Sequence, residues 1–499
     1  MAVTVATPRD IKLNGTCRLS VRISMRGTSF ESPDCLRPWI QEITMHIQML
    51  SAVAALSLLA LAMAAPARAA DVAVTNCNDD GSGSLRAAVA SAANGDVVDL
   101  RELSCNRITL TSGAIVFGQA DLTILGPGWK KFAVSGNRLS SIFRQEPTQP
   151  PPDPGFPRVD GTLRLQGFTI AWGREEADLA AGGCIYANSR VVLDHMHVHH
   201  CVAKGTDPVF PSASGGGVFA WNDVTLIASL VDCNRANPSG TGGGVETHGK
   251  LTLDHSRVSH NVADANGGGS ASTMGLSLSY STVDHNTTAL GNAGGVATAG
   301  AAWINKSTIA YNDADFRGAG EFDNTQPTRI IESTISHNTA NRSEAGIQLD
   351  GRYLPTEVRN STIAFNAATN PFFGSCSEGA GIALAGPVKV VSSIVSGNTC
   401  AGQPSNIGQE AGNPPAQVIG SQNLIGASFV PLPADTLMLD DPRLAPLANN
   451  GGPTMTHALL SDSLAIDRGS NPSNFKYDQR GPGFPRVKGT QADIGAFER

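Results

Sequence analysis

Aromatic residues, charged residues and long hydrophobic runs are all scarce in this sequence. Aromatic residues make up 5% of the 499 residues and charged residues 16%. So few large rings argue against one wide globular core, whereas the 54 glycines suit a narrow core with many tight turns. A 3.6-residue hydrophobic period is also missing from the middle of the chain, which argues against a helical repeat there.

The one long apolar run, Val53–Ala65, is too short to span a bilayer. Ala67-Arg68-Ala69 follows it and has the A-x-A pattern of a signal-peptide cleavage site. We therefore expect residues 45–69 to be a signal peptide cleaved near Ala69, with residues 1–44 a mis-called extension. A start at Met25 would instead retain basic residues before the apolar run. Either start predicts an exported protein, with no transmembrane segment in the mature chain.

Basic runs are absent too. The first 69 residues carry 7 of the 36 basic and 4 of the 43 acidic residues, which leaves 29 basic against 39 acidic residues. An acidic chain argues against a nucleic-acid partner, because binding to phosphate backbones requires a basic face. We expect a monomer whose partner is a polysaccharide or another cell-surface ligand.

No C-x-x-C spacing occurs, so the cysteines do not suggest a metal or redox site. Seven cysteines follow residue 69, and export allows them to oxidise. Cys77–Cys105 and Cys376–Cys400 are expected pairs. Cys201 can pair with Cys233 or with Cys184, and an odd number leaves at least one thiol free.

What the sequence does contain is a repeat of 25–33 residues. Eleven-residue blocks such as LTLDHSRVSHN and LSLSYSTVDHN end at residues 173, 201, 234, 261, 286, 312, 338, 366 and 398. Apolar residues alternate within each block, which indicates strands. A glycine cluster and a second short strand follow, as in GGGVET from Gly242. The variable segments between them, such as Ala203–Ser214, are expected to be loops.

These features predict an all-β fold, a parallel β-helix (solenoid) in which stacked coils bury a shared inner face. The repeat pattern resembles that of bacterial polymorphic outer membrane proteins, and that resemblance implies the right-handed form. An asparagine ends most blocks and is predicted to form a structural ladder of side-chain amides at one corner. Its members are Asn234, Asn261, Asn286, Asn312, Asn338, Asn366 and Asn398.

Both ends of the solenoid need caps. Ser84–Ala93 reads as a short amphipathic helix that covers the first coil. Gly83–Ala88 partly resembles the CSLREA motif of bacterial β-helix proteins, without its Cys and Glu. Pro147–Pro157 is expected to be a surface loop, because proline cannot sit in a central strand.

The tail from Asp441 to Arg499 resembles the terminal domain of choice-of-anchor Q proteins, which ends bacterial surface β-helices. The expected organisation is an N-terminal cap with the first coils (70–162), the repeats (163–425) and a C-terminal capping domain (426–499). Asp467, Asp478 and Asp493 can hold Ca²⁺ through oxygen ligands. The simpler interpretation is a cap fixed by turn-capping aspartates and an Asp478–Arg480 pair.

Candidate chemistry is sparse. His260 and His285 share one slot of adjacent coils, close enough to share a metal, but the same slot also holds Cys, Tyr and Phe, which favours stacking. Glu321, Asp323 and Asp350 form the best acidic cluster for catalysis. We therefore expect a non-enzymatic protein that functions in adhesion or glycan binding. The alternative is a polysaccharide lyase or glycoside hydrolase on a pectate-lyase-like β-helix, supported by fold analogy alone.

Overall fold

The computed structural model describes residues 69–146, 158–322, 326–342, 344–352, 355–371, 376–410 and 415–499. The described residues belong to one compact unit, Ala69–Arg499. The predicted extension, the signal peptide up to Arg68 and the Pro147–Pro157 stretch lie outside the described residues, so their predictions stay untested.

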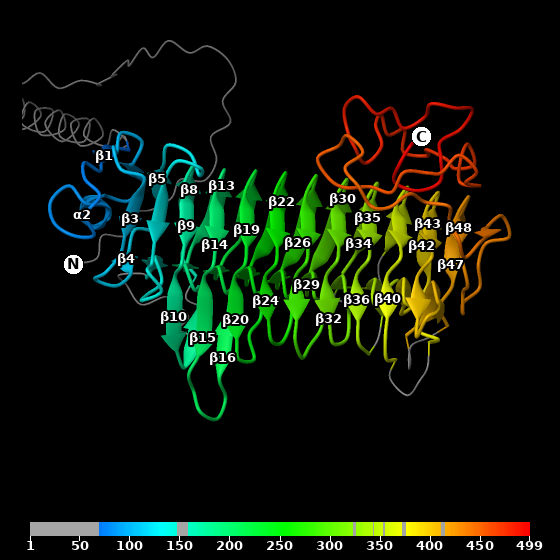
Figure 1. Ribbon diagram of the computed structural model, residues 1–499, viewed down its shortest axis with the longest axis horizontal. Coiled ribbons are helices and arrows are strands. Elements are labelled where there is room, and N and C mark those ends of the chain that lie inside the picture. Colours follow the sequence, from blue (N-terminus) through cyan, green and yellow to red (C-terminus); the bar gives the residue numbers. More distant parts are fainter. Residues whose placement is uncertain are drawn as a thin grey trace, which may run out of the picture. The chain divides into compact units, whose positions relative to one another are not determined.

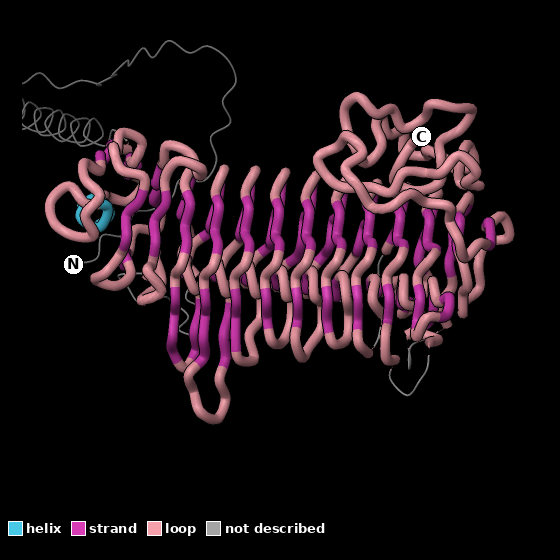
Figure 2. Tube along the Cα trace, viewed as in Figure 1, coloured by secondary structure: helices cyan, strands magenta, loops and turns pink. Residues whose placement is uncertain are grey.

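The described chain forms an all-β parallel solenoid of the right-handed type, as predicted (Figures 1 and 2). Each central coil contributes one strand to each of four long sheets, called A, B, D and C in the order that the chain visits them. The next strand of sheet A then pairs with the previous one in parallel. Adjacent coils therefore repeat at the strand spacing of ~4.8 Å.

Sheets A and B contain the two strands of each eleven-residue block. The strands of sheet A are β1 (Asp71–Ala73), β2 (Val97–Asp99), β5 (Leu122–Leu125), β8 (Thr162–Gln166), β13 (Arg190–Asp194), β18 (Val224–Ile227), β22 (Lys250–Asp254), β26 (Gly275–Ser279), β30 (Ala301–Asn305), β34 (Thr328–Ile331), β38 (Glu357–Arg359), β42 (Val388–Val391) and β47 (Val418–Ser421). Those of sheet B are β3 (Arg107–Thr109), β6 (Ala133–Ser135), β9 (Thr169–Ala171), β14 (His197–His199), β19 (Leu230–Asp232), β23 (Arg257–Ser259), β27 (Thr282–Asp284), β31 (Thr308–Ala310), β35 (Thr334–Ser336), β39 (Thr362–Ala364), β43 (Ile394–Ser396), β48 (Leu424–Ile425) and β49 (Leu437–Met438).

Sheet C contains the strands that follow the glycine clusters. They are β4 (Ile115–Phe117), β7 (Phe143–Gln145), β12 (Ile185–Ala187), β17 (Val218–Ala220), β21 (Val245–Thr247), β25 (Ser270–Ser272), β29 (Val296–Thr298), β33 (Gly320–Phe322), β37 (Ile347–Leu349), β41 (Ile382–Leu384) and β46 (Ile407–Gln409). Gly242 and Gly267 at the preceding corner have φ of +57° and +60°, a conformation in which a Cβ would be strained.

Sheet D follows the asparagine corner, where only loops were expected. Its strands are β10 (Arg174–Ala177), β15 (Val202–Gly205), β20 (Arg235–Asn237), β24 (Val262–Ala263), β28 (Thr287–Thr288), β32 (Asp313–Ala314), β36 (Thr339–Ala340), β40 (Ala367–Ala368), β44 (Thr399–Cys400) and β45 (Gln403–Pro404). The longer insertions add a small extra sheet of β11 (Leu179–Ala181) and β16 (Ser212–Ser214). The prediction of a plain loop at Ala203–Ser214 is therefore wrong, because its backbone pairs with neighbouring coils.

The asparagine column lies at the corner between sheets B and D, with each described member buried. Asn261 illustrates the pattern. Its side-chain nitrogen donates to Val231 O of the preceding coil (3.0 Å) and to Asn286 Oδ1 of the next (3.0 Å). Its Oδ1 accepts from the backbone N–H of Asn234 (3.0 Å). The same bonds recur coil by coil as far as Asn398, whose amide reaches Asn406.

The N-terminal helix α2 (Leu85–Ser91) packs against β2, the second strand of sheet A, and β4, the first strand of sheet C. Ser84 caps it, because its hydroxyl accepts from the Ala87 N–H (3.1 Å). Leu85, Ala88 and Val89 are buried, which matches the apolar face seen in the sequence. No helix among the described residues is long and apolar enough to cross a membrane.

The C-terminal segment does not act as a simple end cap. Residues 424–438 extend sheet B with β48 and β49, but the chain then turns back along the outer face of sheet B (Figure 1). Thr308 Oγ1 donates to Met455 O (2.7 Å), and Ala496 N donates to Thr362 Oγ1 (3.1 Å). The segment 441–499 therefore covers the side of several coils, and we call it the C-terminal flank.

The cysteines form three disulfides among the described residues. Cys77–Cys105 and Cys376–Cys400 pair as predicted. Cys201 takes the second of its two possible partners, Cys184, with a Cα–Cα distance of 5.5 Å. Cys233 is left with a free, exposed thiol.

Candidate functional site

One row of outward-facing side chains runs along sheet C through successive strands. Strand pairing places in register, from β12 to β37, Tyr186, Phe219, Glu246, Ala271, Ala297, Glu321 and Gln348. The row starts with two stacked rings whose centroids lie 5.5 Å apart. It continues with carboxylates at Glu246 and Glu321, separated by two alanines. An alanine pair in this position leaves a hollow between two acidic side chains.

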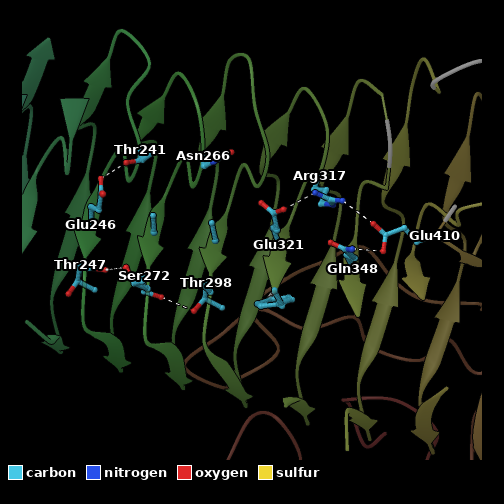
Figure 3. A pocket seen from close by; sticks show the side chains of 15 residues that line it. Thr241, Glu246, Thr247, Asn266, Ser272, Thr298, Arg317, Glu321, Gln348 and Glu410 are labelled. Atoms are coloured by element: carbon cyan, nitrogen blue, oxygen red, sulfur yellow. Dashed lines mark hydrogen bonds and ion pairs between the residues drawn. The ribbon is translucent and has the colours of Figure 1, made fainter. Parts of the chain in front are cut away.

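This hollow is an open groove of about 440 Å³ (Figure 3). Its two ends are formed by Glu246 and by Glu321 with Arg317 and Glu410. Hydroxyl groups one position further along the strands form an edge, with Ser272 Oγ donating to Thr298 Oγ1 (3.0 Å). The groove is lined by Thr241, Glu246, Thr247, Asn266, Ala271, Ser272, Thr273, Ala297, Thr298, Ala299, Arg317, Glu321, Phe322, Gln348 and Glu410.

Arg317 organises one end of the groove. Its guanidinium pairs with Glu344 (Nε to Oε1, 2.6 Å), Glu321 (Nη1 to Oε1, 2.8 Å) and Glu410 (Nη2 to Oε1, 3.4 Å). Gln348 Nε2 donates to the other oxygen of Glu410 (2.6 Å). One cation thus holds three carboxylates in place, and this end of the groove is acidic.

Two carboxyl groups of the groove have raised pKa values. Burial raises the pKa of Glu246, although its hydrogen bond from Thr241 and others act in the opposite direction. Burial also raises the pKa of Glu321, against the attraction of Arg317. A raised pKa favours the protonated acid, which can donate a hydrogen bond as well as accept one.

The structure separates Glu321 from Asp350, the two described members of the predicted acidic cluster. Glu321 lies in the groove, while Asp323 lies outside the described residues. Asp350 is paired with Arg352 (2.6 Å) and does not line the groove. The register explains this, since Gly320 pairs with Ile347 and so brings Gln348, not Asp350, beside Glu321.

The two histidines considered as possible metal ligands stack on each other, the arrangement that the mixed composition of their slot favoured. The rings of His260 and His285 lie face to face, with centroids 4.9 Å apart and planes 5° from parallel. A metal bound to an imidazole lies in the plane of that ring. One ion cannot lie in the planes of two stacked rings at once, so this arrangement does not let a single ion bind both histidines. Tyr311, His337 and Phe365 continue the stack.

The three aspartates of the tail hold turns and an ion pair. Asp478 pairs with Arg480 (2.6 Å) and also accepts from the Glu498 N–H (2.8 Å). Asp467 accepts from the Thr490 N–H, and Asp493 from the N–H groups of Asp467 and Arg499, each at 2.8 Å. No group of three or more His, Cys, Asp or Glu side chains in the described part of the chain is arranged to hold a metal.

Arg317, Glu344 and Glu410 were not predicted as site residues. A signal for the first two is present in the sequence. In two coils the glycine cluster begins with Gly242 and Gly267. In two later coils the same position holds Arg317 and Glu344 instead. A charged pair that replaces a corner glycine in successive coils marks a departure from the repeat. Glu410 has no such signal, because it reaches the groove from two coils beyond Gln348.

Comparison with known proteins adds little to this geometry. No family model matches the chain, and comparison with curated proteins finds no match. Among solved structures the chain is similar to one described as "Crystal structure of pectate lyase Pel9A", with 13% identity and a TM-score of 0.41 over 87% of this chain and 97% of that chain. At this TM-score the likeness carries no argument about activity or ligand.

Proposed function

We propose that the chain is an exported bacterial β-helix protein that binds a neutral or cationic polysaccharide along the groove of sheet C. The observation that carries the proposal is the groove itself. It runs across successive coils, has a floor of small side chains and offers polar groups at each end and along one edge. Coils that repeat every ~4.8 Å present similar groups again and again, which suits a polymer of repeated units.

The charge of the groove supports the choice of ligand. Arg317 is the one basic residue among the described lining residues, and three carboxylates share it. A polyanion such as polygalacturonate would meet an acidic surface, whereas hydroxyl or ammonium groups would find acceptors. Half-exposed aromatic rings lie at this end of the row, Tyr186 in the row itself and Trp221 two residues beyond Phe219, and rings of this kind offer flat apolar faces.

Sequence resemblance supports the setting of the proposal. The repeats similar to those of polymorphic outer membrane proteins, the partial CSLREA motif and the choice-of-anchor Q-like tail belong to bacterial surface proteins. The predicted signal peptide agrees with export. We therefore propose a location on the cell surface or in the medium, with a role in adhesion or glycan binding.

Hydrolysis or lysis of the same polymer is the second candidate, favoured by the raised pKa of Glu321 beside Glu410. Glu246 does not complete a catalytic pair with Glu321. Three coil steps separate them, roughly 14 Å, whereas glycosidase carboxyl groups lie about 5–10 Å apart.

Binding of polysaccharides by residues 70–499 tests the proposal. The panel contains chitosan, a neutral β-glucan and polygalacturonate, with oligosaccharide products followed by mass spectrometry. We expect Ala297→Trp, which fills the floor of the groove, to weaken binding about tenfold or more. Ala301→Trp is the matched control, because Ala301 is an exposed residue of the same coil on sheet A.

Wild-type affinity in Ala297→Trp, or preference for polygalacturonate, would contradict the proposal. Products that form with wild type and disappear in Glu321→Gln would establish the enzymatic alternative instead.

A further inference from the structure

A cluster of imidazole and indole rings lies on the outer face of sheet B, away from the sheet C groove. Strand β14 supplies His197 and His199, and His200 follows at the corner with φ +55°. The rings of His197 and His199 lie 4.3 Å apart, and Trp172 of the preceding coil lies 4.2 Å from His200. Neither the core nor the proposed glycan groove uses these rings.

The decisive feature is the pair His199 and His200. Their Nδ1 atoms face each other at 2.7 Å, and their ring planes are 83° apart. This is nearly perpendicular, in contrast to the parallel stack of His260 and His285. This contact is a hydrogen bond in which one Nδ1 donates its proton to the other. Once that proton moves to Nε2 and the rings turn slightly, both lone pairs become available to one ion.

A carboxylate lies one coil along. Asp232 pairs in register with His199, and its Oδ1 lies 2.9 Å from His197 Nε2. This negative charge is about one-quarter exposed, so it attracts a cation without being buried. On the other side, the guanidinium of Arg138 lies over the Trp172 ring at 4.3 Å and the ammonium of Lys130 over the Trp129 ring at 5.0 Å.

We propose that the Nδ1 atoms of His199 and His200 bind a divalent transition-metal ion such as Ni²⁺, Cu²⁺ or Zn²⁺. Imidazole nitrogen suits these ions, whereas Ca²⁺ and Mg²⁺ prefer oxygen. For the ion to bind, the imidazole that carries its proton on Nδ1 must change to the tautomer with the proton on Nε2. Two neutral histidines therefore release no proton when the ion binds. Water completes the coordination shell, and Asp232 steadies the site electrostatically.

Titration with Ni²⁺ or Zn²⁺ in a calorimeter tests the proposal on residues 70–499. The free thiol of Cys233 follows His200 in the next coil and binds such ions by itself, so all variants carry Cys233→Ser. We expect one ion per chain, with affinity lowered more than about tenfold in His199→Gln and in His200→Gln. Asp232→Asn should weaken binding by about the same factor.

His195→Gln is the matched control. His195 is exposed, belongs to the same coil and interacts with Asp194 rather than with another imidazole. Quenching of Trp172 fluorescence by Ni²⁺, absent in Trp172→Phe, locates the ion independently of affinity. Unchanged affinity in both His199→Gln and His200→Gln, with wild-type circular dichroism, would overturn the assignment, as would equal loss in His195→Gln.

Discussion

Among single residues, the buried asparagines leave the least room for substitution. Asn312 accepts from the Asn286 N–H (3.0 Å) and donates to Val283 O (3.0 Å) and Asn338 Oδ1 (2.9 Å). Leucine has a similar size but satisfies none of these groups. We expect Asn312→Leu to lower the free energy of unfolding by about 3 kcal/mol or more, because each buried group left unpaired costs about 1–3 kcal/mol.

The shift of the urea unfolding midpoint checks this expectation, with Asn341→Leu as the control. Asn341 is exposed and bonds to Asp315 at the surface (2.9 Å), so its loss should change the midpoint little. Equal shifts in the two variants would show that the column is not a special source of stability.

The sequence contained enough information to place Glu321 but not to group it with its partners. Alternation along a strand identifies which side chains point outward, and Glu321 is one of them. Its actual partners come from a corner, Arg317, and from the end of a distant strand, Glu410. Grouping them requires the coil register across loops of different length, which one sequence does not supply. For the same reason the sequence did not show that Gln348, rather than Asp350, lies beside Glu321.

At the scale of the element, strand length decides what was predictable. The strands of sheets A and B carry alternating apolar residues over an eleven-residue block, and the glycine cluster in the sequence predicts the strand of sheet C that follows it. Sheet D strands such as β24 have only two residues, too few to show any period. Their pairing follows from the coils on either side rather than from their own sequence.

The disulfide Cys184–Cys201 fastens the start of β12 to the end of the β14 segment within one coil. It closes a loop with a sequence separation of 17 residues, which corresponds to about 3 kcal/mol in the chain-entropy account. We expect the double variant Cys184→Ala/Cys201→Ala to lose about that much stability. Thermal unfolding measures it, and Cys233→Ser should leave the unfolding temperature unchanged. A shift from Cys233→Ser as large as that of the double variant would contradict the assignment of Cys233 as the free thiol.

At the scale of the whole described unit, the C-terminal flank converts the outer face of sheet B into an interface. Lys306, at the end of the β30 segment, donates to Glu332 and to the backbone oxygens of Tyr477 (2.7 Å) and Asp478 (2.6 Å). Near β35, His457 of the flank contacts the Ser336 hydroxyl through Nε2 (2.8 Å) and donates from Nδ1 to Ala445 O (2.7 Å). The sequence led us to expect a capping segment at this end of the chain, but not one that packs sideways along sheet B. Sequence pattern locates an end of the chain and does not say which face that end covers.

The docking of the flank should weaken in acid, because burial lowers the pKa of His457 from 6.5 to about 4. The docked form binds fewer protons than the free form between these values, so this contribution is intact above pH 6.5 and decreases as the pH falls towards 4. At pH 5 this contribution to the stability of the docked flank is smaller by about 2 kcal/mol than at neutral pH. The pKa of His337, stacked on His457, is lowered by burial and acts in the same direction, whereas the pKa values of Glu332 and Glu498 are raised by burial and oppose it.

Hydrogen exchange of residues 441–499 at pH 7 and pH 5 measures the effect. His457→Gln should reduce the pH dependence while leaving exchange in the coils before residue 280 unchanged. A pH dependence identical in His457→Gln and wild type would place the proton uptake elsewhere.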